Sequence, residues 1–91
     1  MNAGPAPVRV VFFASLREVT GEAELQLNAD SLDTLMSQLE ARFAPEIYAE
    51  LVADNVRIAI NQALLEGGKD PAQTMLEPGC EVAFLPPVTG G

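Results

Sequence analysis

The spacing of hydrophobic residues changes at Ser31, and this change constrains the fold more than any other feature of the sequence. After Ser31, hydrophobic side chains recur at helical intervals, at Leu32, Leu35, Met36, Leu39 and Phe43. This spacing predicts one face of an amphipathic helix, whose first turn either Asp30 or Ser31 can cap. Pro45 interrupts the pattern, and a short second helical segment is predicted before Asp54.

Strand-forming sequence precedes this helix. Val8 to Ala14 is a β-branched and aromatic run that is too short for a typical helix, so it predicts a buried strand. Hydrophobic and polar residues then alternate from Ala23 to Asn28, which is the period of a half-exposed strand. We interpret the intervening Ser15 to Gly21 as a polar turn. The two strands are therefore expected to form a hairpin.

More strands are predicted after the helix. Val56 to Ile60 forms one, and Asn61-Gln62 favours a tight turn into Ala63-Leu64-Leu65. Pro78-Gly79 then turns the chain into a last strand, Cys80 to Leu85. The order ββαβββ predicts an α+β fold, a mixed sheet of about five strands with one main helix. By analogy, this is the β-grasp arrangement of ubiquitin-like domains.

The chain is expected to form one domain with a loose segment at each end. Its 91 residues suit a single core. Glycine and proline in residues 1–7 predict a disordered leader, and residues 8–85 are assigned to the β-grasp domain. Residues 86–91 are predicted to be a flexible functional tail.

The tail combines two prolines with two terminal glycines. Pro86 and Pro87 have no N–H to donate, so the last strand cannot continue past Leu85. Gly90 and Gly91 lack a Cβ and give the thinnest backbone that can enter a narrow channel. Six extended residues span about 20 Å. This length suits delivery of the terminal carboxylate into another protein's active site, although a frayed end is the alternative.

Charge and composition exclude several classes of function. The chain has 13 acidic and 5 basic residues, a net charge of −8, so binding to nucleic acid or to an anionic membrane is not expected. Histidine is absent and a single cysteine is present, which argues against a zinc cluster and against an internal disulfide. No apolar run is long enough to cross a bilayer, and no secretion signal is seen. A cytoplasmic protein is expected.

The remaining candidate motifs carry little chemistry. Gly67-Gly68-Lys69 lacks the first glycine of a phosphate loop and the hydroxyl residue after its lysine. Glu22 and Glu24 share the polar face of a strand, where solvated glutamates are the rule. Cys80 is expected to face the core as a small hydrophobic residue, and a persulfide relay through it is the alternative. No catalytic constellation within the chain is predicted.

The C-terminal carboxylate of Gly91 is the reactive group that remains. A carboxylate is a poor acyl donor, and it is activated by attack on the α-phosphate of ATP to give an acyl-adenylate. The chain has no bound cofactor, phosphate cradle or metal site of its own, so an activating enzyme must supply ATP and catalysis. Sulfur can then attack Gly91 to give a thiocarboxylate, or an amine can attack it to give a conjugate.

Strand parity predicts where such an enzyme docks. If Phe12 and Phe84 face the helix, then Phe13 and Leu85 face the other side of the sheet, where Leu64 can join them. Large apolar residues on an exposed sheet face are typical of a docking patch. The alternative is that loops cover this face.

Several motifs between residues 8 and 91 recur together in one known family. They are Val10-Val11-Phe12-Phe13-Ala14, Leu16-Arg17-Glu18, Gly21, Ala59-Ile60-Asn61-Gln62, Gly79, Glu81-Val82-Ala83-Phe84 and Pro86-Pro87-Val88-Thr89-Gly90-Gly91. On these motifs the sequence resembles the MoaD family, the small sulfur-carrying subunits of molybdopterin synthase. The double proline before Gly-Gly is the most specific part, because related carriers for thiazole synthesis usually lack it. Leu85 and Cys80 depart from the family, where a second Phe and an acidic residue are common.

The resemblance implies a function for the tail. A ubiquitin-activating-like adenylyltransferase would adenylate Gly91, which would become a thiocarboxylate and pass its sulfur to cyclic pyranopterin monophosphate. The tail residues Pro86, Pro87, Val88, Thr89 and Gly90 would insert into the large subunit of molybdopterin synthase, which supplies the catalytic residues of a heterotetramer. By the same resemblance, partners are contacted by Phe13, Leu64 and Leu85.

Three alternatives remain open from the sequence. The chain could carry sulfur for another product, such as thiazole, cysteine or thiolated tRNA. It could be a protein modifier that forms isopeptide bonds with lysines. It could also be a plain interaction module with an incidental tail.

Overall fold

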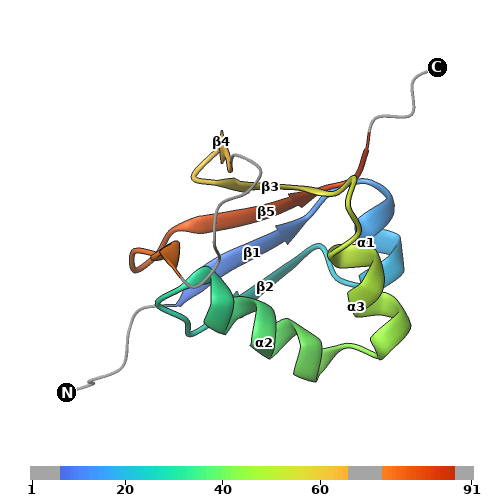
Figure 1. Cartoon of the computed structure of the whole chain (residues 1–91), viewed down its shortest axis with the longest axis horizontal. Helices are drawn as coiled ribbons and strands as arrows, with labels where there is room; N and C mark the ends of the chain where they lie inside the picture. Colours follow the sequence, from blue (N-terminus) through green and yellow to red (C-terminus); the bar gives the residue numbers. More distant parts are fainter. Residues whose placement is uncertain (1–6, 66–72, 88–91) are drawn as a thin grey trace.

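The computed structural model describes residues 7–65 and 73–87. Along these residues the elements are β1 (Val8–Phe12), α1 (Ser15–Thr20), β2 (Glu24–Leu27), α2 (Leu32–Arg42), α3 (Pro45–Leu51), β3 (Arg57–Ile60), β4 (Ala63–Leu64) and β5 (Glu81–Leu85). Figure 1 shows α2 and α3 along one side of the sheet, with α1 at the end where β1 and β5 finish. Within the described part of the chain, no helix has the length and apolar character needed to span a membrane.

The strands form a mixed sheet in the order β2-β1-β5-β3-β4. β1 pairs with β2 in antiparallel fashion, with Val8 opposite Leu27, which confirms the predicted strand pair. β1 and β5 lie side by side and parallel, with Val10 opposite Val82, and the other neighbours are antiparallel. The predicted α+β fold with a five-stranded mixed sheet is confirmed. Parallel pairing also brings the ends of β1 and β5 to the same edge of the sheet.

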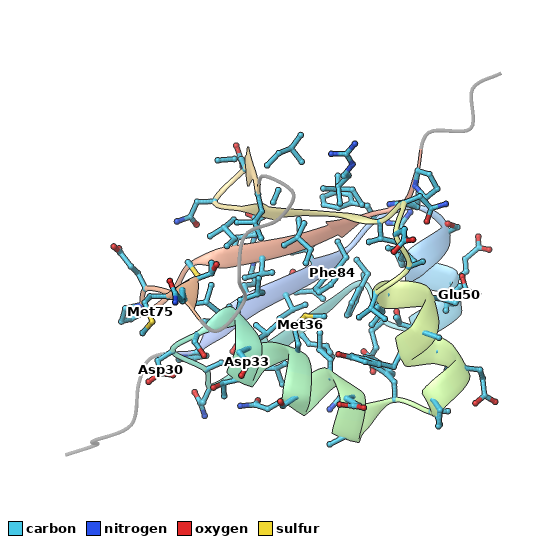
Figure 2. The ribbon with its side chains drawn as sticks, viewed as in Figure 1. Asp30, Asp33, Met36, Glu50, Met75 and Phe84 are labelled. Atoms are coloured by element: carbon cyan, nitrogen blue, oxygen red, sulfur yellow. The ribbon has the colours of Figure 1, made fainter. Side chains whose placement is uncertain are left out.

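Alternate residues of the two central strands form the core. Val10 and Phe12 of β1 and Val82 and Phe84 of β5 are at most 1% exposed. The Phe12 and Phe84 ring centroids lie 5.6 Å apart. Figure 2 shows Met36 of α2 and Phe84 between the helix and the sheet, and Met36 packs against the core. Each fully buried large apolar side chain contributes about 1.5–3 kcal/mol, so this inward row holds the sheet to the helices.

The helix α2 begins where the hydrophobic spacing changes. Ser31 is its cap, and the Ser31 hydroxyl oxygen accepts a hydrogen bond from the backbone N–H of Thr34 at 3.1 Å. Asp30, the other candidate, makes no such cap. The predicted stripe is confirmed, because the buried residues of α2 are Leu32, Leu35 and Leu39. The predicted second helical segment is α3, whose first residue is Pro45.

Replacing Ser31 with alanine is expected to lower the free energy of unfolding by about 1 kcal/mol, because one N–H of the first turn then loses its acceptor. Ser37→Ala is the matched control, since Ser37 is exposed on the same helix and alanine favours helix formation there. Chemical denaturation of both variants measures the difference. Equal stability of the two variants would show that the cap contributes nothing.

The segment between β1 and β2 is a helix and not the polar turn that the sequence predicted. Residues 15–20 form α1, and Leu16 within it is 3% exposed. Gly21 ends the helix with φ 77°, and its N–H donates to the Arg17 carbonyl oxygen at 3.0 Å. A left-handed glycine is a common helix end because it has no Cβ to clash. Burial of Leu16 ties this short helix to the core.

A two-residue turn joins β3 to β4, as predicted. Asn61 and Gln62 have φ of 51° and 71°, the left-handed pair that a tight type I′ hairpin requires. The Asn61 side-chain oxygen accepts from the Glu81 N–H at 3.0 Å, and the Asn61 N–H donates to the Glu81 carbonyl at 2.8 Å. The turn pairs Ala59 with Leu64. It therefore places Leu64 on the edge strand β4, directly opposite Ala59 of β3.

Candidate functional site

The face of the sheet opposite α2 and α3 carries the apolar residues that strand parity singled out. The Phe13 N–H donates to the Phe84 carbonyl at 3.1 Å, so the alternation of β1 continues one residue beyond the strand. Phe12 and Phe84 are buried in the core, whereas Phe13 is 41% exposed and Leu64 is 63% exposed. Leu85 is half-buried. The predicted inward and outward residues are therefore confirmed.

A groove on this face, here called the outer groove, brings the three predicted residues together. Its apolar lining is Phe13, Ala14, Leu64, Leu85, Pro86 and Pro87, and its polar lining is Asp54, Asn55 and Arg57. A second hollow adjoins it and shares Phe13, Leu64 and Leu85. The alternative in which loops cover this face does not hold for Phe13 and Leu64, which stay exposed. An open apolar groove of this kind suits a protein partner.

The tail leaves the sheet beside the outer groove. β5 ends at Leu85, as predicted, and the next residues, Pro86 and Pro87, line the groove. Because β1 and β5 are parallel neighbours, their carboxyl ends lie at the same end of the sheet. Phe13 directly follows β1 there, and Pro86 directly follows β5. The remaining predicted tail residues lie outside the described residues, namely Val88, Thr89, Gly90 and Gly91. Their predicted roles stay predictions.

The carboxylates predicted to lie on the surface are held in exposed ion pairs. Arg9 lies 3.6 Å from Glu24 and 3.3 Å from Glu81, and Arg42 lies 3.3 Å from Glu22. Exposed pairs of this kind contribute at most about 1 kcal/mol each. Glu22 and Glu24 thus each face a guanidinium and do not form an acid–base pair. Among the described residues, no group of three or more His, Cys, Asp or Glu could hold a metal ion.

Arg57 is the functional candidate that sequence reasoning missed. It lies on β3 opposite Leu85, on the same outer face as the groove. The three ion pairs among the described residues do not include it, although Asp54 lines the same groove. The sequence shows that Arg57 and Ala59 are two residues apart, so they lie on the same face of the strand. Its position beside Leu85 depends on the β3–β5 register, which the sequence alone does not give.

Cys80 is a core residue, as the sequence predicted. Its side chain belongs to the buried cluster and is 4% exposed. Burial raises the pKa of the Cys80 thiol, which disfavours the thiolate that sulfur chemistry needs. Cys80 also precedes β5, whereas the tail follows Leu85, about 17 Å away along a five-residue strand. The structure therefore gives the persulfide relay no support.

Comparison with known proteins agrees with this geometry. The ThiS family profile matches residues 10–91. The molybdopterin synthase sulfur carrier subunit of Haemophilus influenzae is 34% identical over 86 residues, covering 92% of this chain and 99% of that protein.

Solved structures extend the likeness to the fold. The small archaeal modifier protein 1 of Methanosarcina acetivorans superposes with a TM-score of 0.75 at 27% identity, covering 98% of this chain and all of that one. A chain from the complex of subunits 1 and 2 of the molybdopterin-converting factor of Helicobacter pylori gives a TM-score of 0.68 at 26% identity, covering 93% of this chain and 99% of that one. The sheet, the outer groove and these matches together place the chain in the MoaD/ThiS family of ubiquitin-like β-grasp sulfur carriers.

Proposed function

We propose that this chain is the sulfur carrier subunit of a molybdopterin synthase. The observation that carries the proposal is the 34% identity to a molybdopterin synthase sulfur carrier subunit over 99% of that protein's length. The chain supplies the acyl group, and the catalytic residues belong to its partners. Its substrate class is therefore a pterin precursor that accepts sulfur within the large subunit.

The proposed reaction begins at the carboxylate of Gly91, the last residue of the sequence. A carboxylate oxygen attacks the α-phosphate of ATP, and pyrophosphate leaves, which gives an acyl-adenylate. Hydrosulfide then attacks the carbonyl carbon of Gly91, forms the C–S bond and loses its proton, and AMP leaves with the bridging oxygen. The product is a thiocarboxylate, whose sulfur is transferred to cyclic pyranopterin monophosphate. ATP is used by the activating enzyme and is not a cofactor bound to this chain.

The outer groove gives both partners a place to dock. Pro86 and Pro87 line it, so a protein that covers the groove lies beside the start of the tail. The tail then delivers Gly91 to that protein's active site, with Gly90 keeping the approach narrow. We propose contact through Phe13, Leu64 and Leu85 with both the adenylyltransferase and the large subunit, in a heterotetramer. The Helicobacter pylori complex of subunits 1 and 2 supports an assembly of two kinds of subunit.

A reconstituted reaction tests this function. Thiocarboxylated chain is mixed with the large subunit from the same organism and cyclic pyranopterin monophosphate, and molybdopterin is measured. The proposal predicts product in proportion to the thiocarboxylate consumed. No product, while the same large subunit is active with another thiocarboxylated carrier, would reassign the chain to another sulfur pathway.

Phe13→Asp is expected to weaken binding to the activating enzyme at least about tenfold, because it removes a large apolar contact and adds a charged group that the partner must desolvate. The free energy of unfolding should change by less than about 1 kcal/mol, since Phe13 is 41% exposed. Val52→Asp is the control, because Val52 is 45% exposed and does not line the groove. Titration calorimetry and chemical denaturation give both quantities. Unfolding of the Phe13 variant would show that its face was assigned wrongly.

A protein-modifier function is the second candidate. It is favoured by the superposition on small archaeal modifier protein 1 at a TM-score of 0.75. An activated Gly91 could be attacked by a lysine amine in place of sulfur, which forms an isopeptide bond. Conjugates of higher mass in cells, lost when Gly91 is deleted, would favour this candidate over sulfur carriage.

A further inference from the structure

Arg57 occupies a distinctive position on the docking face. Its neighbours across the outer groove are largely apolar, including Phe13, Leu64 and Leu85. Arg57 is exposed, and it is the only cationic side chain among the described residues that line the groove. None of the three ion pairs in the described part of the chain involves it. The groove therefore presents one guanidinium that is held in no ion pair, beside apolar side chains and the Asp54 carboxylate.

Two carboxylates lie around the groove, and only one of them has a partner of its own among the described residues. Glu81 lines the adjoining hollow, and its carboxylate lies 3.3 Å from Arg9. Asp54 lines the outer groove and forms no ion pair with Arg57. The chain as a whole carries a net charge of −8, so its general field does not attract an acidic protein. An attraction for an acidic group on this face would have to come locally, from Arg57.

A partner that covers the groove removes water from the guanidinium of Arg57. Removing water from a charged group is costly unless a hydrogen-bonded partner of opposite charge replaces it. A carboxylate matches the planar fork of arginine, and the two can form paired hydrogen bonds. Apolar side chains around that carboxylate would at the same time cover Phe13 and Leu64. The shape and the charge of the groove therefore both fit a partner surface with one carboxylate surrounded by apolar side chains.

We infer that the activating enzyme docks on the outer groove with a carboxylate that pairs with Arg57, set among apolar side chains. The inference rests on the proposed function, in which an activating enzyme receives the tail. That enzyme is the occupant because the groove is continuous with Pro86 and Pro87, where the tail begins. Six extended residues reach about 20 Å, so a protein that adenylates Gly91 has to seat close to the groove.

The test separates a specific pair from a general charge effect. Arg57→Leu, Arg57→Glu and Arg42→Glu are compared with the unchanged chain by surface plasmon resonance against the cognate activating enzyme. Arg57→Glu and Arg42→Glu change the net charge equally, and Arg42 is an exposed residue of α2 that does not line the groove. Loss of long-range steering changes the association rate, whereas loss of a desolvated pair changes the dissociation rate.

We expect Arg57→Leu to raise the dissociation rate at least about tenfold, with an association rate within about threefold of the unchanged chain. Arg57→Glu should dissociate faster still, and Arg42→Glu should alter the association rate alone. Circular dichroism confirms that each variant is folded. Dissociation of both Arg57 variants at the unchanged rate would overturn the inference.

Asp54→Asn tests the alternative for this site, in which the carboxylate that pairs with Arg57 is Asp54 of the same chain and not a residue of the enzyme. If Arg57 pairs with the enzyme, Asp54→Asn should leave the dissociation rate within about threefold of the original. An equal rise for Asp54→Asn and Arg57→Leu would overturn the inference. The same samples are assayed for sulfur incorporation. If the unsubstituted chain binds the enzyme and gains sulfur, the proposed function is supported, independently of the result for the Arg57 variants. If the unsubstituted chain neither binds the enzyme nor gains sulfur, both the proposed function and the inference about Arg57 are wrong.

Discussion

A chain extended by one residue beyond Gly91 is expected to lose thiocarboxylate formation and sulfur transfer by more than about 100-fold, with its fold unchanged. The added residue moves the free carboxylate by about 3.5 Å and takes Gly91 out of the reacting position. Misplacement of a reacting group by about 1 Å can already cost about 100-fold in rate, so the expected loss is large. Intact mass spectrometry after incubation with the activating enzyme, ATP and a sulfur source measures it.

The matched control adds one residue before Met1, at the other end of the chain. This variant should gain sulfur at the original rate, because the acyl group is untouched. Chemical denaturation should give equal free energies of unfolding for both extended chains. Full activity of the C-terminally extended chain, with the extra residue still present by mass, would contradict the carrier function.

Phe84→Ala is expected to lower the free energy of unfolding by about 3–5 kcal/mol, a large part of the stability of a small domain. Phe84 is fully buried on β5, and its ring centroid lies 5.6 Å from that of Phe12. Truncation leaves a cavity between the sheet and α2 that neighbouring side chains cannot fill completely. Urea denaturation followed by circular dichroism measures the loss.

Leu85→Ala is the matched control, because Leu85 is the next residue and faces the outer groove. It is half-buried, so its loss of stability should be about 1 kcal/mol. Its binding to the activating enzyme should weaken, whereas a folded fraction of Phe84→Ala should bind normally. Equal destabilisation by the two substitutions would contradict the assignment of the two sheet faces.

The long elements could be predicted because their periodicity is strong. The stripe from Leu32 to Phe43 repeats over three turns, and the parity of β1 and β5 separates Phe12 from Phe13. The turn at Asn61-Gln62 has a residue type that tolerates left-handed backbone. Strand boundaries were less well predicted, since β3 begins at Arg57 and not at Val56. Where a strand ends depends on hydrogen bonds with its neighbours, which the local sequence does not specify.

The helix α1 was missed because six residues are too few to show a helical period. The residue before the helix also gives no capping signal in the sequence. Ala14, which precedes it, has φ 50° and makes no side-chain cap, and a positive φ is uncommon for alanine. Gly21 after the helix was the usable signal, because glycine favours the left-handed helix end.

The candidate site was predictable in part. Period-two alternation in the sequence placed Phe13 and Leu85 on one face, and Leu64 was a candidate to join them. Arg57 required the β3–β5 register, and register depends on tertiary pairing between segments far apart in the sequence.

Sulfur carriage by Gly91 can be seen in the intact mass of the chain. The chain is incubated with its cognate activating enzyme, ATP and a sulfur source, and the mass is then mapped by fragmentation. A sulfur carrier should gain the mass of one oxygen replaced by one sulfur, located at Gly91. An unchanged mass, with an enzyme shown to form the acyl-adenylate on another carrier, would contradict sulfur carriage.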